Sequence, residues 1–436
     1  MSAARVRALY GRSSRVRLSD WEPARLPSRP VVPPSRDPAI RDLAQQLTAL
    51  PTDGRRVLRC LQPSAESGCL ESPTEPGRLV DLASNDYLGL SRHPQVLAAA
   101  ARAMREEGLG AAASPLVTGR RPSHRVLEEE LARWLGRERA LLFPSGFQAN
   151  LAAVVALTGR RGVVLADRLS HHSLLAGVRC SGARLQRFAH NDLADLERRL
   201  TACEASHRTG APPPLVISES CFSMEGSSPD VAALAGLCAR HGARLLVDEA
   251  HALGVLGEGG RGLCHRLNDP VTLITGTFGK AFGSGGAFLA GDAVMGDWLL
   301  QTSGAYRYST ALAPPLAAAA LAALQLIETH PGWVRELAAA ADIWRQRLTA
   351  AGWPPLPGRG PILPLIVGSD AAALTLQQEL ERAGVLCIAI RPPTVPPGSA
   401  RIRLVVRRQN PAAALETVLT VLDDVGGRLK AVPHAP

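Results

Sequence analysis

Short apolar runs alternate with amphipathic segments between about residue 80 and residue 290 of the chain. The apolar runs predict strands at 140–143, 162–166, 215–218, 244–247 and 273–275. Helical spacing predicts helices at 123–135, 193–200 and 231–241, and in the first of these Leu127, Leu131 and Trp134 share one face. Strands that alternate with helices in this way indicate a mostly parallel sheet covered by helices.

A second, smaller α/β domain is predicted in the last quarter of the chain. A helix at 334–350 precedes expected strands at 362–367, 385–390 and 401–406, with helices near 371–383 and 411–424. The expected organisation is therefore, in chain order, an extension at 1–38, a connecting segment at 39–80, a large domain at 81–325 and a small domain at 326–428.

The composition is typical of a soluble globular protein, with 46% hydrophobic and 20% charged residues among 436. The most apolar stretch, 312–327, contains Pro314, Pro315 and Gln325, which favours a packed helix over a membrane span. The eight cysteines are scattered and form no CxxC pair. That pattern favours a reduced, cytoplasmic compartment and argues against a metal site.

The net charge of +10 is concentrated at the start of the chain. Residues 1–36 carry eight arginines against Asp20 and Glu22, a net +6, which leaves about +4 for the rest. Aromatic residues make up only 4% of the chain, so the dense basic and aromatic face of a nucleic-acid binder is not expected. The Arg/Pro-rich start has the composition of a disordered segment or a transit peptide, and an incorrectly assigned start codon would look the same.

The first candidate for chemistry is Lys280. It follows an expected strand in the run Thr277-Phe278-Gly279-Lys280 and precedes the glycine-rich segment 283–286. A lone lysine between glycines is usually a surface residue. A cofactor aldehyde, however, would need a lysine on a short loop with small neighbours and a nearby hydroxyl, such as that of Thr277, for a phosphate. Burial would lower the lysine pKa from its reference value of about 10.4 and favour imine exchange.

A second motif lies 29 residues earlier, where Asp248 ends an apolar strand and His251 follows three residues later. Asp248 alone fits a helix cap. It also fits a carboxylate that keeps a pyridinium nitrogen protonated, so that the ring can accept electrons, while His251 bonds the phenolic oxygen. The combination of Asp-x-x-His with Thr-x-x-Lys is more specific than either half.

Three other segments follow expected strands. The turn at 143–150 includes Gly146 and Phe147, and it predicts either a plain helix cap by Ser145 or a phosphate seat at a helix start. His171 follows another strand and is either structural or stacked on an aromatic ring. Ser223 lies in a loop, and a role in forming a turn would explain this serine nearly as well as a role in the site.

Read together, these segments resemble the α-oxoamine synthase family of fold-type I pyridoxal-phosphate enzymes. The resemblance covers about residues 55 to 425, with the shared motifs in the same order. These motifs are Ser84-Asn85-Asp86-Tyr87-Leu88-Gly89-Leu90, the run at 187–192, Thr277-Phe278-Gly279-Lys280, Tyr308-Ser309-Thr310 and the Arg-Pro-Pro-Thr-Val-Pro run that begins at Arg391. The resemblance implies an aspartate aminotransferase-like α/β fold, with a large mostly parallel sheet domain and a smaller C-terminal α/β domain.

The resemblance also implies a site for pyridoxal 5'-phosphate. Lys280 would bind the cofactor aldehyde, Asp248 the ring nitrogen and His251 the phenolic oxygen, with Ser223 nearby and His171 stacked on the ring. The phosphate would be held by Gly146, Phe147 and Thr277, and by Thr310 across the interface of a homodimer. The amino-acid carboxylate would be bound by Arg391 with Asn85, and Arg59 would lie near the substrate. The guanidinium of Arg391, fixed before two prolines, suits a bidentate carboxylate contact, although an exposed arginine is also an ordinary surface charge.

The implied reaction is a decarboxylative condensation of L-alanine with a pimeloyl thioester, on CoA or an acyl carrier protein, as in biotin biosynthesis. Lys280 would move the α-proton, and His251 or His171 would polarise developing charge. A sister reaction would join glycine to acetyl-CoA or succinyl-CoA, or serine to a long-chain acyl-CoA. A non-catalytic regulator could keep the fold, but it would be expected to lack the lysine.

The chain departs from the family pattern at Ala111-Ala112-Ala113, where relatives often carry glycines. Alanine lacks the freedom of glycine to adopt positive φ. We therefore expect a change in the shape of this active-site loop, and in the acyl pocket beside it.

Overall fold

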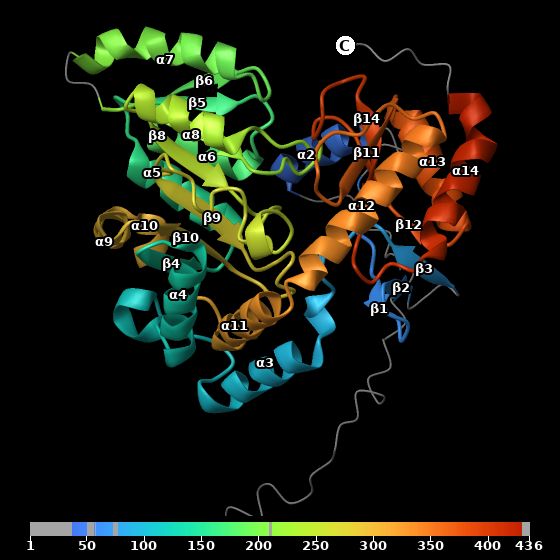
Figure 1. The fold of residues 1–436 in the computed structure, drawn as a ribbon, viewed down its shortest axis with the longest axis horizontal. Coiled ribbons are helices and arrows are strands. Elements are labelled where there is room, and N and C mark those ends of the chain that lie inside the picture. Colours follow the sequence, from blue (N-terminus) through green and yellow to red (C-terminus); the bar gives the residue numbers. More distant parts are fainter. Residues whose placement is uncertain (1–36, 50–55, 57, 73–76, 209–211, 430–436) are drawn as a thin grey trace, which may run out of the picture. The chain divides into compact units, whose positions relative to one another are not determined.

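The computed structural model describes residues 37–49, 56, 58–72, 77–208 and 212–429 (Figure 1). The chain divides into a unit that ends at Cys60 and a unit that begins at Leu61. The described part of the first unit contains helix α2 (Pro38–Ala49) and the exposed segment 58–60. Nearly all of the expected Arg/Pro-rich extension lies outside the described residues.

A seven-stranded sheet forms the centre of the second unit, in the order β4-β10-β9-β8-β7-β5-β6. Its strands are β4 (Arg139–Phe143), β5 (Val163–Asp167), β6 (Arg184–Phe188), β7 (Leu215–Glu219), β8 (Arg244–Asp248), β9 (Leu273–Thr277) and β10 (Ala287–Gly291). β10 runs antiparallel to β4 and β9, and the other neighbours are parallel. The mostly parallel sheet is therefore confirmed, and β6 and β10 are additions to the predicted strands.

Helices cover both faces of this sheet (Figure 1). The helices of the second unit are α3 (Pro94–Glu106), α4 (Pro122–Leu135), α5 (Gly146–Leu157), α6 (His172–Ser181), α7 (Leu193–Arg208), α8 (Val231–Arg240), α9 (Ala293–Thr302), α10 (Gly304–Arg307), α11 (Pro314–Thr329), α12 (Gly332–Ala350), α13 (Asp370–Arg382) and α14 (Ala413–Leu429). Side chains alternate along β8, so Leu245 and Val247 join the core under α7 and α8, while Leu246 joins the core under α5 and α6.

The apolar stretch at 312–327 forms most of α11, which packs against α3 and α4. Ten of the residues of α11, including both prolines at its start, are buried. Among the described helices, none combines the length and apolar character that a membrane crossing requires.

Two smaller sheets complete the second unit. One has the order β1-β2-β3-β12 and the other has the order β11-β14-β13. Their strands are β1 (Gln62–Pro63), β2 (Cys69–Glu71), β3 (Arg78–Asp81), β11 (Ile362–Gly368), β12 (Val385–Leu386), β13 (Ile388–Ile390) and β14 (Ala400–Val405). The single strand expected at 385–390 is thus divided, because β12 pairs with β3 whereas β13 pairs with β14. The proposed domain boundaries stay a prediction.

Ala112 adopts a backbone conformation that L-residues avoid. Its φ is +60°, and the same loop continues into a π-helical turn, Pro115–Gly119. A left-handed conformation brings the alanine Cβ too close to the following carbonyl oxygen. The loop therefore keeps the positive φ that glycine would allow, and the strain falls on this alanine.

Replacing Ala112 with glycine is expected to raise the free energy of unfolding by about 1 kcal/mol, because the left-handed penalty disappears. Urea unfolding followed by circular dichroism measures the change. Ala113→Gly is the matched control, since φ at Ala113 is not positive, and it should lower stability by roughly 0.5–1 kcal/mol. Equal destabilisation by both changes would show that Ala112 is not strained.

Candidate active site

The polar residues of the candidate site lie at one edge of the seven-stranded sheet. Glu219 ends β7, Asp248 ends β8 and Thr277 ends β9, and Glu219 is the register partner of Asp248. These strands are parallel, so their carboxyl ends meet at the same edge, which is where α/β proteins of this kind bind ligands. Lys280 follows three residues after β9.

Lys280 is the electrostatic centre of this edge. Desolvation by burial lowers its pKa to about 8, against the opposing influence of the Asp248 and Glu219 carboxylates. The loop behind it packs closely at Gly283, whose φ is +61° and where a Cβ would lie 2.2 Å from the backbone nitrogen of Ser91. Lysine occurs only at positions 280 and 430 of the sequence. A lysine at this edge of the sheet is therefore not explained by an abundance of lysine in the chain.

Asp248 is buried and held by two N–H donors. Asn150 Nδ2 donates to its Oδ2 at 2.7 Å, and the backbone N–H of Ala250 donates to its Oδ1 at 2.9 Å. Asn150 also donates to Ser173 Oγ at 2.9 Å, and its own Oδ1 is buried without a hydrogen-bond partner. The carboxylate is therefore fixed in orientation at the strand end.

His171 joins the same network from the start of α6. Its Nδ1 lies 2.7 Å from Ser173 Oγ, and its backbone N–H donates to Glu219 Oε1 at 2.6 Å. Desolvation lowers the pKa of His171, and burial raises the pKa of Glu219 well above its usual range. His171 itself remains exposed, so the ring is accessible for stacking.

His251 is buried against Tyr87. Its Nδ1 lies 2.6 Å from the Tyr87 hydroxyl, and the two rings meet edge to face. Burial holds the pKa of His251 well below its usual range, and the charges of Lys280 and Arg403 lower it further. His251 is thus neutral and close to both cations.

The start of α5 and the end of β9 converge. A Cβ placed on Gly146 would lie 3.9 Å from Thr277 Oγ1, which accepts a hydrogen bond from the backbone N–H of Gly279 at 3.2 Å. Ser145 caps α5 by accepting from the backbone N–H of Gln148 at 3.3 Å, while Phe147 is exposed. The same turn can therefore provide both the Ser145 cap and a phosphate-binding site.

Arg403 was not predicted as a site residue, but it lies within the site. Its Nη2 donates to Asn85 Oδ1 at 2.9 Å and its Nε donates to the carbonyl of Ser223 at 2.6 Å. It is 6% exposed, and its charge lowers the pKa of both Lys280 and His251. The signal in the sequence was weak, because an arginine in an alternating strand resembles a surface residue. Asn150, Ser173, Glu219 and Tyr87 were also unassigned.

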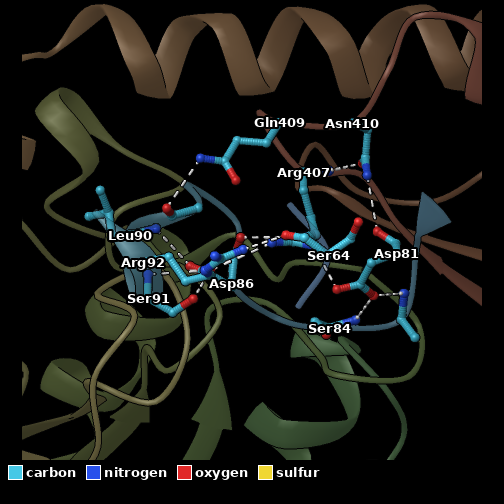
Figure 2. A network of polar contacts seen from close by, with 12 residues as sticks. Ser64, Asp81, Ser84, Asp86, Leu90, Ser91, Arg92, Arg407, Gln409 and Asn410 are labelled. Atoms are coloured by element: carbon cyan, nitrogen blue, oxygen red, sulfur yellow. Dashed lines mark hydrogen bonds and ion pairs between the residues drawn. The ribbon is translucent and has the colours of Figure 1, made fainter. Parts of the chain in front are cut away.

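A buried arginine fixes the loop that carries Asn85 and Tyr87 (Figure 2). Arg407 pairs with Asp81 at 2.5 Å and donates from Nε to the carbonyl of Asp86 at 3.0 Å. Asp81 in turn accepts from the backbone N–H of Ser84, and Asp86 accepts from that of Leu90, each at 2.9 Å. The loop is therefore held on both sides of the two site residues.

Two predicted site residues of the second unit, Thr310 and Arg391, are not brought to Lys280 in this way. Thr310 is exposed and lines a cavity of about 470 Å³ with residues of the 114–117 loop. Arg391 is partly buried, and its carbonyl accepts a hydrogen bond from the Thr394 N–H at 3.0 Å. Arg59 is exposed and belongs to the first unit. Their roles stay predictions.

The chemistry of these groups fits pyridoxal phosphate. A desolvated amine at Lys280 suits an aldehyde, the fixed Asp248 carboxylate suits a ring nitrogen, and His171 presents an exposed ring. The start of α5 beside Thr277 suits a phosphate. Among the described residues, no group of three or more metal-ligating side chains is assembled.

Comparisons with known proteins agree with this fit. The sequence profile of the class I and II aminotransferases matches residues 78–418. The 8-amino-7-oxononanoate synthase of Cellvibrio japonicus is 42% identical over 369 residues, which are 82% of this chain and 90% of that protein. A structure of SPT, serine palmitoyltransferase, with PLP superposes with a TM-score of 0.80 at 25% identity, covering 91% of this chain and 98% of that one. The 8-amino-7-oxononanoate synthase of Francisella tularensis superposes with a TM-score of 0.68 at 25% identity, covering 81% and 98%.

Lys280 of the cofactor-free protein is expected to react with trinitrobenzenesulfonate, a reagent that does not itself titrate in this pH range, at a rate that rises with pH with a midpoint near 8. The lowered pKa has this sign because burial penalises the charged form, so the reactive neutral amine already dominates above about pH 8. Mass spectrometry of the Lys280 peptide measures the rate. Lys430→Arg leaves Lys280 as the sole lysine and serves as the background. A midpoint near the reference value of about 10.4 would contradict a desolvated amine.

Proposed function

We propose that this chain, which belongs to the class I and II aminotransferase family and, within it, to the α-oxoamine synthases, joins L-alanine to a pimeloyl thioester. The products are 8-amino-7-oxononanoate, the free thiol and carbon dioxide. The carbon–carbon bond to the acyl group forms, while the thioester bond and the bond to the alanine carboxylate break. The observation that carries the proposal is the desolvated Lys280 beside the fixed Asp248 carboxylate, in a chain 42% identical to an 8-amino-7-oxononanoate synthase.

Pyridoxal phosphate, when bound, supplies an aldehyde for the amino group and a protonated ring that withdraws electrons from the substrate α-carbon. Lys280 would hold the cofactor between turnovers and, once displaced, would be about half neutral at a pH near 8 and mostly neutral above it. A neutral amine can accept the α-proton of L-alanine and later return a proton to the product. The lowered pKa therefore serves both tasks of this side chain.

The neighbouring side chains keep this chemistry in place. Asp248 would hold a proton at the ring nitrogen, and Asn150 keeps its carboxylate oriented. His251, kept neutral by burial, shares a hydrogen bond with Tyr87, and its other ring nitrogen would be available to an oxygen of the bound molecules. His171 would cover one face of the ring, and Ser173 fixes its imidazole.

Arg403 and Asn85 are the groups best suited to bind the alanine carboxylate. The Arg403 guanidinium is buried near Lys280, and two of its nitrogens are already fixed by Asn85 and the Ser223 carbonyl. A guanidinium held in this way has a remaining N–H edge for a carboxylate. Arg391, assigned to this role by family resemblance, follows β13 and stays a candidate for the same anion.

The proposal includes a homodimer in which Thr310 of one copy contributes to the phosphate site of the other. Thr310 is exposed beside the exposed apolar side chains of Leu116, Val117 and Tyr308, as an interface residue would be in a separate chain. A cytoplasmic location, inferred from the scattered cysteines, also stays a prediction.

The cofactor-loaded protein is expected to change its absorption spectrum selectively with L-alanine, compared with glycine and L-serine. Addition of pimeloyl-CoA should then release free thiol and carbon dioxide in equal amounts. Lys280→Ala should lose the absorption band of the lysine-bound cofactor and all turnover. Selectivity for glycine or serine would indicate that the chain catalyses a sister reaction. Absence of the band in the unmodified protein would exclude a pyridoxal-phosphate enzyme.

Exchange of the two candidate arginines for lysine should distinguish their roles. Arg403→Lys is expected to raise the KM for L-alanine by on the order of tenfold or more, because lysine cannot replace a fixed guanidinium. Arg391→Lys should have a smaller effect if Arg403 makes the direct contact. Steady-state kinetics at saturating thioester measure both. The reverse order of effects would assign the carboxylate to Arg391.

A further inference from the structure

A polar relay that starts from a buried carboxylate connects a strand end to the loop that follows β7. Asp167, the last residue of β5, is fully buried, and its Oδ1 lies 2.9 Å from His190 Nδ1. His190 Nε2 lies 2.8 Å from Ser227 Oγ. Because a carboxylate only accepts hydrogen bonds, Nδ1 of His190 donates to Asp167. Ser227 is thereby linked to the rigid sheet through one imidazole.

The relay meets a compact turn at 222–227. The backbone N–H of Phe222 donates to the carbonyl of Ser227 at 2.9 Å, and that of Gly226 donates to the carbonyl of Phe222 at 2.8 Å. His190 also packs edge to face on the Phe222 ring, with centroids 4.5 Å apart. On its far side the turn touches β11, because a Cβ on Gly226 would lie 2.3 Å from the Ile362 carbonyl oxygen. The turn is fixed from two directions.

This turn holds two arginines of β14. The carbonyl of Ser223 accepts from Arg403 Nε at 2.6 Å, and Glu225 pairs with Arg401 at 3.1 Å. The carbonyl of Met224 also accepts from Arg401, at 3.3 Å. Arg401 and Arg403 point to the same side of β14, since side chains alternate along a strand. A displacement of the turn would therefore displace the Arg403 guanidinium.

We propose that His190 is a positioning residue for amino-acid binding. By linking Asp167 to Ser227, it sets the position of the 222–227 turn, and through the Ser223 carbonyl it sets the orientation of Arg403 toward the substrate carboxylate. This inference rests on the proposed function for the role of Arg403. The segment 187–192, which contains His190, would thus position Arg403 although it does not itself contact the cofactor in the proposed site.

Aspartate, histidine and serine in this order also resemble the catalytic triad of a hydrolase. The surroundings of Ser227, however, argue against its acting as a nucleophile. A serine nucleophile needs free backbone donors nearby to stabilise an oxyanion. The N–H groups of Phe222 and Gly226 are already engaged inside the turn. The geometry is therefore suited to holding the loop.

The test compares His190→Ala and Ser227→Ala with the unmodified, cofactor-loaded protein. Spectral titration gives the Kd for L-alanine and for L-alaninamide, which lacks the carboxylate. The Kd for L-alanine is expected to rise about tenfold in His190→Ala, and less in Ser227→Ala, where one hydrogen bond is lost. The Kd for L-alaninamide should change less than about twofold, because it carries no carboxylate to form the charged contact with Arg403.

His241→Ala is the matched control. His241 also bridges to a carboxylate, with its Nδ1 2.7 Å from Glu204 Oε1 of α7, but its backbone N–H donates within α8 and not to the 222–227 turn. This variant loses a similar polar contact and should leave both Kd values unchanged. A rise in the Kd for L-alanine in His241→Ala equal to that in His190→Ala would overturn the proposal.

Amide hydrogen exchange on the cofactor-free protein gives a second readout, independent of binding. Exchange at 222–227 should be faster in His190→Ala and Ser227→Ala than in the unmodified protein or His241→Ala. Unchanged exchange, or an equal loss of affinity for L-alanine and L-alaninamide, would contradict positioning through the turn. If the unmodified protein does not bind L-alanine, the proposed function fails, and the same comparison is made with the amino acid that it does bind and the corresponding amide.

Discussion

The balance of buried charge at the carboxyl edge of the seven-stranded sheet constrains the rest of the site. Lys280, Asp248 and Glu219 share a space poor in water, where electrostatic interactions are stronger than in solvent. Burial lowers the pKa of the lysine and raises that of Glu219, so both the amine and this carboxyl group are shifted toward their neutral forms. Neutral partners such as Asn150 complete the hydrogen bonds without adding charge. Any change in one of these groups alters the protonation of the others.

The C-terminal strand β14 and the residues that follow it meet this edge through buried arginines. Arg401, Arg403 and Arg407 are 4%, 6% and 8% exposed. A buried guanidinium without partners would be strongly destabilising, so each must find its carbonyl or carboxylate. Those partners belong to segments far away in the sequence, around Asp81 and Glu225. The positions of the Asn85 loop and of the 222–227 turn are therefore coupled to the packing of the C-terminal sheet.

The sequence predicted best what depends on local pattern. β7 and β8 are apolar on both faces because helices cover both sides, and their ends carry the motifs that identified Asp248. β6 escaped prediction because it is an edge strand with polar residues, and β10 because it is rich in alanine and glycine. Arg403 could not be found in this way. Its role depends on contacts with Asn85 and Ser223, which are 318 and 180 residues away along the chain.

Arginine and lysine have separate tasks in this protein, for a physical reason. A guanidinium stays charged even when buried, and its planar N–H groups fix carbonyls and carboxylates in two directions. Arg403 and Arg407 use that property. Proton transfer needs the opposite property, a base that can become neutral near physiological pH, and a desolvated ε-amine provides it. Among the described residues lysine occurs only at position 280. Arginine at that position would keep the charge but could neither bind the aldehyde nor accept the α-proton, whereas lysine at position 403 would lose the fixed geometry.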